Sequence, residues 1–185
     1  VLCGGSIKDS FGNIKPLKSF GKYKTLLEAN IASLLDSKFD NVIVTITDSS
    51  LFDSFSNVVC DIQTRIKSKI TLVVLPFDTS GPAETLYQTL KRQTISGPIV
   101  VKDCDTLTIV PKPFTGNCVS GIDVGTLKMP IISKKASYLV VSNSRILDIV
   151  EQDIKSTIIS TGIYSFISAL EFCQAYEFLI NSFYR

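Results

Sequence analysis

Short apolar runs alternate with segments of helical periodicity between Val1 and Asp105. Such runs, bounded by turn-forming residues, are typical of buried strands, and they predict strands at residues 1–3, 41–47, 70–75 and 99–101. In the intervening segments apolar residues recur at helical spacing, which predicts helices over residues 25–35, 52–66 and 83–92. Strands that alternate with helices favour an α/β fold with a mostly parallel central sheet flanked by helices.

The pattern changes after Asp105. Residues 106–117 are broken by Pro111, Pro113 and Gly116 and are predicted to form a loop. Strands are predicted at residues 118–124, 138–141, 145–150 and 158–166, and a terminal helix at residues 169–183. The Ser142-Asn143-Ser144 segment indicates a hairpin turn. We therefore expect a single domain over residues 1–185 with a mixed β C-terminal half.

The composition is that of a folded domain with one sizeable core, since 45% of the 185 residues are hydrophobic and 19% are charged. The net charge is +2 and the lysines are scattered, so a nucleic-acid partner is not expected. The apolar runs are too short to predict a membrane span. A chain that opens on Val1 and closes on a helix is expected to be a fragment of a longer protein, and additional domains or a homo-oligomer stay open.

The cysteine and histidine counts restrict the chemistry. Five cysteines, an odd number without C-x-x-C spacing, argue against a disulfide framework and a structural zinc site, and they favour a reducing cytoplasm. The absence of histidine excludes Ser-His-Asp and Cys-His hydrolases and histidine-ligated metals. Chemistry here must use carboxylates, lysines, backbone amides and a hard metal.

Two segments could carry such chemistry. Asp103 and Asp105 follow the predicted strand at 99–101, and ligands collect beyond the carboxyl ends of strands in open α/β sheets. The pair is a candidate holder for a divalent cation, or alternatively a polar strand end. The loop from Gly4 to Gly12 follows the first strand, and its amides could approach a phosphate. It matches neither standard phosphate-binding glycine motif, and an ordinary turn is the alternative.

Several short motifs, in order, resemble the sugar-phosphate nucleotidyltransferases over nearly the whole chain. They are Gly4-Gly5-Ser6, Lys15-Pro16-Leu17, residues 24–28, residues 79–85, residues 100–105, Ser137-Tyr138, residues 149–151, Ser156 and residues 161–166. The resemblance implies a GT-A-like (Rossmann-like) nucleotidyltransferase fold. Residues 1–105 would form the nucleotide-binding half and residues 106–185 the sugar-phosphate-binding half.

The resemblance also implies a reaction, in which a sugar phosphate or similar phosphorylated alcohol attacks a nucleoside triphosphate and pyrophosphate leaves. The product would serve surface polysaccharide (capsule) synthesis, and the cofactor would be Mg²⁺. The implied metal ligands are Asp103 and Asp105, and the implied catalytic residues are Lys15 and Asp105. The implied nucleotide-binding residues are Gly4, Gly5, Ser6, Lys8, Gly81, Glu84 and Thr85. Those implied for the sugar phosphate are Glu151, Lys155 and Gly162.

Four of these residues also have a structural interpretation. Lys15 could be a solvated loop lysine and Glu84 a first-turn helix acid favoured by the helix dipole. Glu151 could be a charge at a strand end. Gly162 could mark a bulge or close backbone packing.

Two departures from the family pattern leave other functions open. The family loop usually ends in arginine, where this chain has Ile7-Lys8, and lysine cannot make the bidentate contact of arginine to phosphate. The family also commonly has lysine where this chain has Gln152, although Lys155 is near in sequence. A catalytically impaired binding or scaffold domain is therefore one alternative. A GT-A glycosyltransferase that uses a nucleotide sugar is another.

Overall fold

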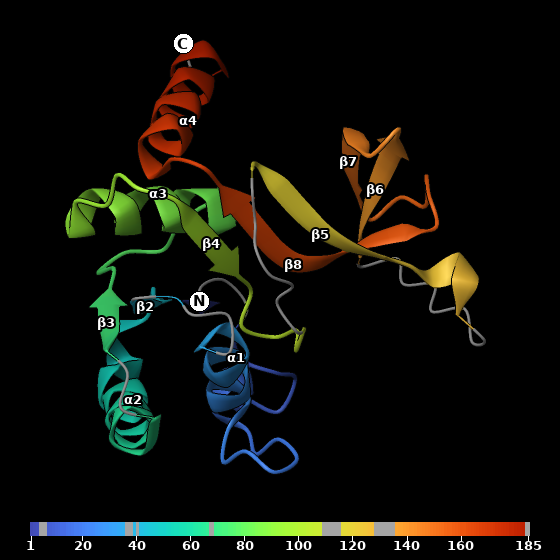
Figure 1. Cartoon of the computed structure of the whole chain (residues 1–185). Coiled ribbons are helices and arrows are strands. Elements are labelled where there is room, and N and C mark those ends of the chain that lie inside the picture. Colours follow the sequence, from blue (N-terminus) through green and yellow to red (C-terminus); the bar gives the residue numbers. More distant parts are fainter. Residues whose placement is uncertain are drawn as a thin grey trace.

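The computed structural model describes residues 1–3, 7–35, 39, 41–66, 69–108, 116–127 and 136–183, and it confirms the α/β class. Helices and strands alternate up to β4, and strands dominate afterwards (Figure 1). In chain order the strands and helices are β1 (Leu2–Cys3), α1 (Leu26–Leu35), β2 (Val42–Ile46), α2 (Phe52–Ile66), β3 (Ile70–Val74), α3 (Pro82–Gln93), β4 (Ile99–Lys102), β5 (Cys118–Asp123), β6 (Ser137–Ser142), β7 (Arg145–Glu151), β8 (Ile158–Phe166) and α4 (Ala169–Phe183). Short 3-10 helices are η1 (Lys15–Leu17), η2 (Ser49–Leu51) and η3 (Val124–Thr126).

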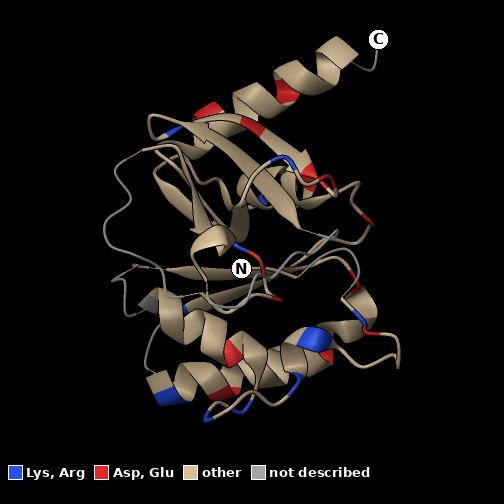
Figure 2. Ribbon diagram, turned by 90° about the vertical axis from the view of Figure 1, so that its right-hand side faces the viewer, with Lys and Arg blue, Asp and Glu red and all other residues tan. Residues whose placement is uncertain are grey.

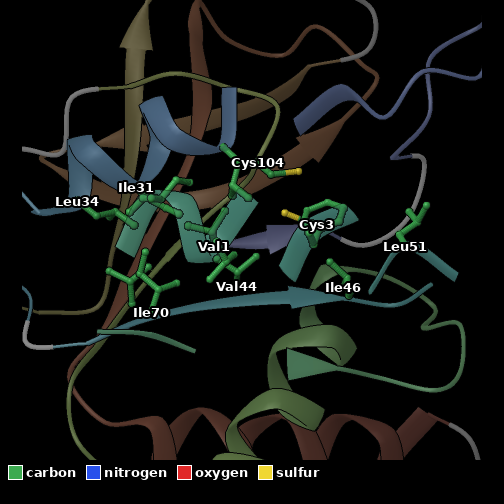
Figure 3. Packing of buried hydrophobic residues seen from close by; sticks show 14 of the residues in the cluster. Val1, Cys3, Ile31, Leu34, Val44, Ile46, Leu51, Ile70 and Cys104 are labelled. Atoms are coloured by element: carbon green, nitrogen blue, oxygen red, sulfur yellow. The ribbon is translucent and has the colours of Figure 1, made fainter. Parts of the chain in front are cut away.

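A parallel sheet of order β1-β2-β3 forms the N-terminal half. Successive side chains of a strand point to opposite faces. On one face Val44 and Ile46 pack with α1 and α2 in an apolar cluster that includes Cys3 and Cys104 (Figure 3). On the other face the Thr45 hydroxyl lies 3.0 Å from the Thr89 hydroxyl of α3. The predicted helices therefore cover both faces of the sheet.

The C-terminal half is an antiparallel sheet of order β4-β8-β6-β7, with β5 also paired to β8. The sequence pattern led us to expect β4 in the parallel sheet, but β4 pairs antiparallel with β8 along its four residues. Its parallel link to β1 is the single bridge between Leu2 and Asp103. The physical reason is length, because β1 has two residues and β8 has nine. β4 thus belongs to the second sheet and touches the first.

The predicted hairpin joins β6 and β7. Asn143 and Ser144 have φ of 49° and 61°, and positive φ at both central residues is the conformation of a type I′ turn. Asparagine tolerates this region better than most residues, which explains why the Ser-Asn-Ser signal was readable from the sequence.

Charged residues are interspersed over the described part of the molecule, with Lys and Arg beside Asp and Glu along the same helices and strands (Figure 2). α4 extends away from the body of the protein (Figure 1), and its Phe178 and Phe183 are exposed. In the described segments no helix is both long enough and apolar enough to cross a membrane.

Candidate functional site

A cavity of about 220 Å³ lies where the two sheets meet, at the Leu2–Asp103 bridge. Its lining includes five residues that the sequence pointed to, namely Lys15, Gly81, Thr85, Asp103 and Asp105. They come from η1, from the first turn of α3 and from the segment after β4. Residues up to about ninety positions apart in the chain are thus brought to one cavity by the parallel bridge between β1 and the residue after β4.

Lys15 is placed by a small hairpin. The segment from Ile7 folds back at Ile14, and the Lys15 N–H donates to the Ile7 carbonyl at 2.9 Å. Within the turn the Asp9 carboxylate accepts the N–H groups of Phe11 and Asn13, each at 2.9 Å. Pro16 is the second residue of the 3-10 helix that Lys15 begins, and it is buried. The lysine therefore extends from an anchored stretch of backbone.

Asp103 is the partly buried acid of the cavity. Its N–H donates to the Gly162 carbonyl at 2.9 Å, which ties it to β8. Burial raises the pKa of Asp103 to about 6, and the nearby charge of Asp105 acts in the same direction. Asp105 itself is exposed. Two like charges at one cavity are an arrangement that a bound cation would stabilise.

Gly162 explains how Asp103 fits. The glycine has φ of +71°, and a Cβ built on it would lie 2.6 Å from Oδ2 of Asp103. A side chain at this position would collide with the carboxylate, and most residues with a side chain avoid this positive φ. The strand therefore needs glycine here for two separate reasons. Gly162 and Asp103, which were predicted separately as site residues, therefore lie in direct contact.

Lys102 is a component of the site that the sequence analysis did not single out. Its side chain is fully buried, and Nζ donates to the Thr106 carbonyl at 2.7 Å. Burial lowers the pKa of Lys102 to about 8, while Asp103 and Asp105 oppose that shift. The lysine thereby spans the turn that carries both carboxylates. The signal that could have found it was a lysine at the end of an apolar strand.

The start of α3 is built by local hydrogen bonds. Gly81 is the N-cap and Pro82 occupies the first turn, a common position for proline. The Glu84 carboxylate accepts the Ser80 N–H at 2.6 Å, and this bond lowers the pKa of Glu84. The Thr85 hydroxyl donates to the Gly81 carbonyl at 3.1 Å. Glu84 therefore caps the helix whose first turn lines the cavity; its contact with a nucleotide stays a prediction.

Lys8 lines a second, neighbouring cavity of about 460 Å³. Asp48 and Asp78, which follow β2 and β3, share this cavity, and Ile7 lines both cavities. The hairpin thus places Lys8 at the ends of β2 and β3 and Lys15 at the ends of β1 and β4. Gly4, Gly5 and Ser6, predicted to contact phosphate, lie outside the described residues.

The residues predicted for a sugar phosphate lie on the antiparallel sheet and the segment after it. Glu151 ends β7 and is exposed, and Lys155 is exposed and paired with Asp153 at 3.1 Å. Neither lines the 220 Å³ cavity. Tyr164 of β8 is partly buried: burial raises its pKa, the hydroxyl of Ser160 opposes that shift, and the charges of Asp103 and Glu151 add to it. Sequence reasoning missed this tyrosine because it sits within an apolar strand.

The carboxylates of Asp103 and Asp105 suit a Mg²⁺ ion that is bound together with a phosphate substrate. Within the described ranges there is no group of three or more Cys, Asp or Glu side chains that could form an all-protein metal cage. Mg²⁺ in phosphate-transfer sites commonly uses one or two carboxylates and takes its other ligands from water and substrate. Asp103 and Asp105 at the 220 Å³ cavity provide that number of carboxylates.

Several solved structures share this fold. A nucleoside-diphosphate-sugar pyrophosphorylase from Vibrio cholerae RC9 has a TM-score of 0.75 and 17% identity, and the match covers 97% of this chain and 76% of that one. HddC from Yersinia pseudotuberculosis has a TM-score of 0.68 and 15% identity, with 94% and 77% covered. The inositol-1-phosphate CTP transferase from T. maritima has a TM-score of 0.67 and 14% identity, with 90% and 68% covered. Neither a family model nor a curated protein sequence matches the chain. At these identities the likeness establishes the fold.

Proposed function

We propose that this chain is a nucleotidyltransferase that moves a nucleoside monophosphate from a nucleoside triphosphate to a sugar phosphate or a similar phosphorylated alcohol. The observation that carries the proposal is the gathering of Lys15, Gly81, Thr85, Asp103 and Asp105 around one cavity. The fold supports it, because its structural neighbours include a nucleoside-diphosphate-sugar pyrophosphorylase and an inositol-1-phosphate CTP transferase.

The chain's own residues would act by positioning and by charge. Asp103 and Asp105 would hold Mg²⁺, which when bound neutralises phosphate charge. Lys15 would face the phosphate that is attacked and offset its developing negative charge. Gly81 and Thr85 would lie against the base, and the amides of Gly4 to Ser6 would take the triphosphate. Such a reaction needs no covalent intermediate, because alignment of the two substrates supplies much of the rate.

The acceptor would lie over β8. Gly162 leaves space beside the strand for the Asp103 carboxylate, and Tyr164 follows two residues later on the same strand. Lys155 would supply positive charge to the acceptor phosphate where the family has its lysine at the position of Gln152. Gln152 has φ of 60°, so the backbone turns sharply directly after Glu151. We further infer a cytoplasmic enzyme that supplies activated sugars for surface polysaccharide.

The test is pyrophosphate release from each nucleoside triphosphate with Mg²⁺ and a panel of sugar 1-phosphates and inositol 1-phosphate. We expect turnover with at least one pair, its loss on chelation of the metal, and its return when Mg²⁺ is restored. Asp105→Asn should lower turnover by roughly 100-fold or more, since it removes transition-state charge stabilisation. Asp53→Asn, on the exposed first turn of α2, is the matched control and should leave turnover unchanged.

The other outcomes separate the alternatives. Calorimetric binding of a nucleotide without pyrophosphate release would identify a non-catalytic binding domain. Transfer from UDP-sugars, with no release from triphosphates, would identify a glycosyltransferase. Absence of both binding and release with every pair would refute the proposal.

A further inference from the structure

Two thiols lie next to each other where β1 meets the segment after β4, and one of them, Cys104, lines the 220 Å³ cavity. Leu2 and Asp103 form the parallel bridge between β1 and the end of β4, and the next residue on each segment is a cysteine. The side chains of Cys3 and Cys104 contact each other, and this interaction adds to the effect of burial in raising the pKa of the Cys3 thiol. In Figure 3 their sulfur atoms lie near each other, between the two segments. The pair is unexplained by the proposed reaction, which uses the carboxylates on either side of Cys104.

The two sulfurs differ in access. Cys104 is 8% exposed and lines the cavity together with Lys15 and Asp105, whereas Cys3 is 1% exposed and lies behind it. A small solute that enters the cavity therefore meets Cys104 first. Cys60 and Cys118 are exposed elsewhere, and Cys173 is buried in a different apolar cluster.

The Leu2–Asp103 bridge holds the two backbones at the spacing of neighbouring strands one residue before the cysteines, and that spacing suits a covalent bond. Neighbouring strands lie about 4.8 Å apart. A disulfide requires Cα atoms roughly 4.4–6.8 Å apart. Cys104 is held in place from α1, because Nδ2 of Asn30 donates to its carbonyl at 3.0 Å. Both cysteines also pack in the same apolar cluster, so their side chains lie on one side of the sheet.

We propose that Cys3 and Cys104 form a reversible disulfide when hydrogen peroxide enters the candidate site, and that this bond reduces nucleotide turnover. The Cys104 sulfur attacks one peroxide oxygen, which gives a sulfenic acid and one water. The Cys3 sulfur then attacks the sulfenic sulfur, and the hydroxyl leaves as a second water with the Cys3 proton. Two thiols are oxidised, one peroxide is reduced to two waters, and a dithiol reductant reverses the bond.

The effect on turnover rests on the proposed function, while formation of the bond does not. Cys104 lies between Asp103 and Asp105, and drawing its sulfur to Cys3 pulls the turn that carries both carboxylates. Burial raises the pKa of the Cys3 thiol well above its ordinary value. The second step should therefore be slow at neutral pH and faster in alkaline solution.

The experiment uses the Cys60→Ser/Cys118→Ser variant, which removes the exposed thiols and keeps the pair. After peroxide treatment and alkylation, peptide mass spectrometry should find a Cys3–Cys104 linked peptide that dithiothreitol abolishes. Pyrophosphate release should fall at least tenfold in parallel and recover on reduction. Cys104→Ala in the same background should form no link and lose the peroxide sensitivity.

Each result decides one part of the proposal. A Cys104 that becomes sulfinic acid, or stays free and alkylated, without a Cys3 link would overturn the disulfide. A link that forms while turnover is unchanged would overturn its effect on the site. If the protein releases no pyrophosphate in any state, the linked peptide still tests the pair, and the proposed function fails separately. If Cys104→Ala does not fold, the linked peptide of the background variant decides alone.

Discussion

The carboxyl group of Asp103 is partly buried, so water cannot fully stabilise its charge. Its pKa of about 6 lies above the ordinary value of 3.8, and burial is the main cause. Between these two values the folded protein holds more protons than the unfolded one, so the free energy of unfolding falls as pH rises. The loss is complete above about pH 6, where both states are ionised. Asp103 therefore costs stability at neutral pH, which is typical of groups held for function.

Asp103→Asn should for this reason stabilise the protein and inactivate it. The uncharged amide removes the burial cost, so we expect a gain of about 1–3 kcal/mol at pH 8 that disappears below about pH 4. Denaturant unfolding across this pH range measures the difference. Pyrophosphate release should meanwhile fall by roughly 100-fold. Equal stability of the two proteins at pH 8 would show that the Asp103 charge is not penalised in the fold.

Sequence reasoning found these carboxylates but missed the residues that support them. Asp103 and Asp105 stand out because they follow an apolar strand, where parallel strands present their ligands. Lys102 also follows this apolar run, but neither Lys102 nor Asn30 was singled out, because a lysine at a strand end and an asparagine in a helix are usually solvated. Their burial depends on contacts with Thr106 and Cys104, and the Asn30 contact spans 74 positions of the chain.

At the scale of elements, β8 is the strand that completes the site. It pairs with β4, β5 and β6, and its Gly162 opposes Asp103. The sequence predicted the range of this strand correctly, because residues 158–166 form one continuous β-rich run. The sequence did not predict that β8 pairs with β4, because an apolar run does not specify which strand it will pair with.

Gly162→Ala should damage stability and activity together. A methyl group would strain the backbone at φ +71° and displace the Asp103 carboxylate. We expect a loss of about 1–3 kcal/mol in the free energy of unfolding. We also expect a drop of tenfold or more in turnover. Gly97→Ala is the matched control, since a Cβ there meets nothing within 4 Å. If both variants behave like the parent, close packing at Gly162 has no role.

At the scale of the whole molecule, two apolar clusters hold the sheets together. One contains β1, β2, α1 and α2, and the other joins α3, β4 and α4. Ile163 of β8 is fully buried in the first cluster although its strand belongs to the C-terminal sheet. Leu2 of β1 conversely packs in the second. This exchange of side chains should couple the halves into one folding unit.

Ile163→Ala tests that coupling. Removing a buried isoleucine side chain leaves a cavity and should cost about 2–5 kcal/mol. Unfolding followed by far-UV and near-UV signals should give one shared transition, shifted by the same amount for both signals. Ile149→Ala, at an exposed position of β7, is the control and should change stability by about 0.5 kcal/mol or less. Separate transitions for the two signals would show that the chain does not unfold as one cooperative unit.

The sequence by itself determined the order of the strands and helices, the hairpin at Asn143 and the carboxylates at a strand end. These features are local, because hydrophobic periodicity and turn conformation depend on neighbouring residues. Tertiary structure alone decided that β4 joins β8, that Gly162 makes room for Asp103, and that Cys3 touches Cys104. Those contacts join residues 59 to 101 positions apart, and no local preference specifies which distant partner a side chain meets.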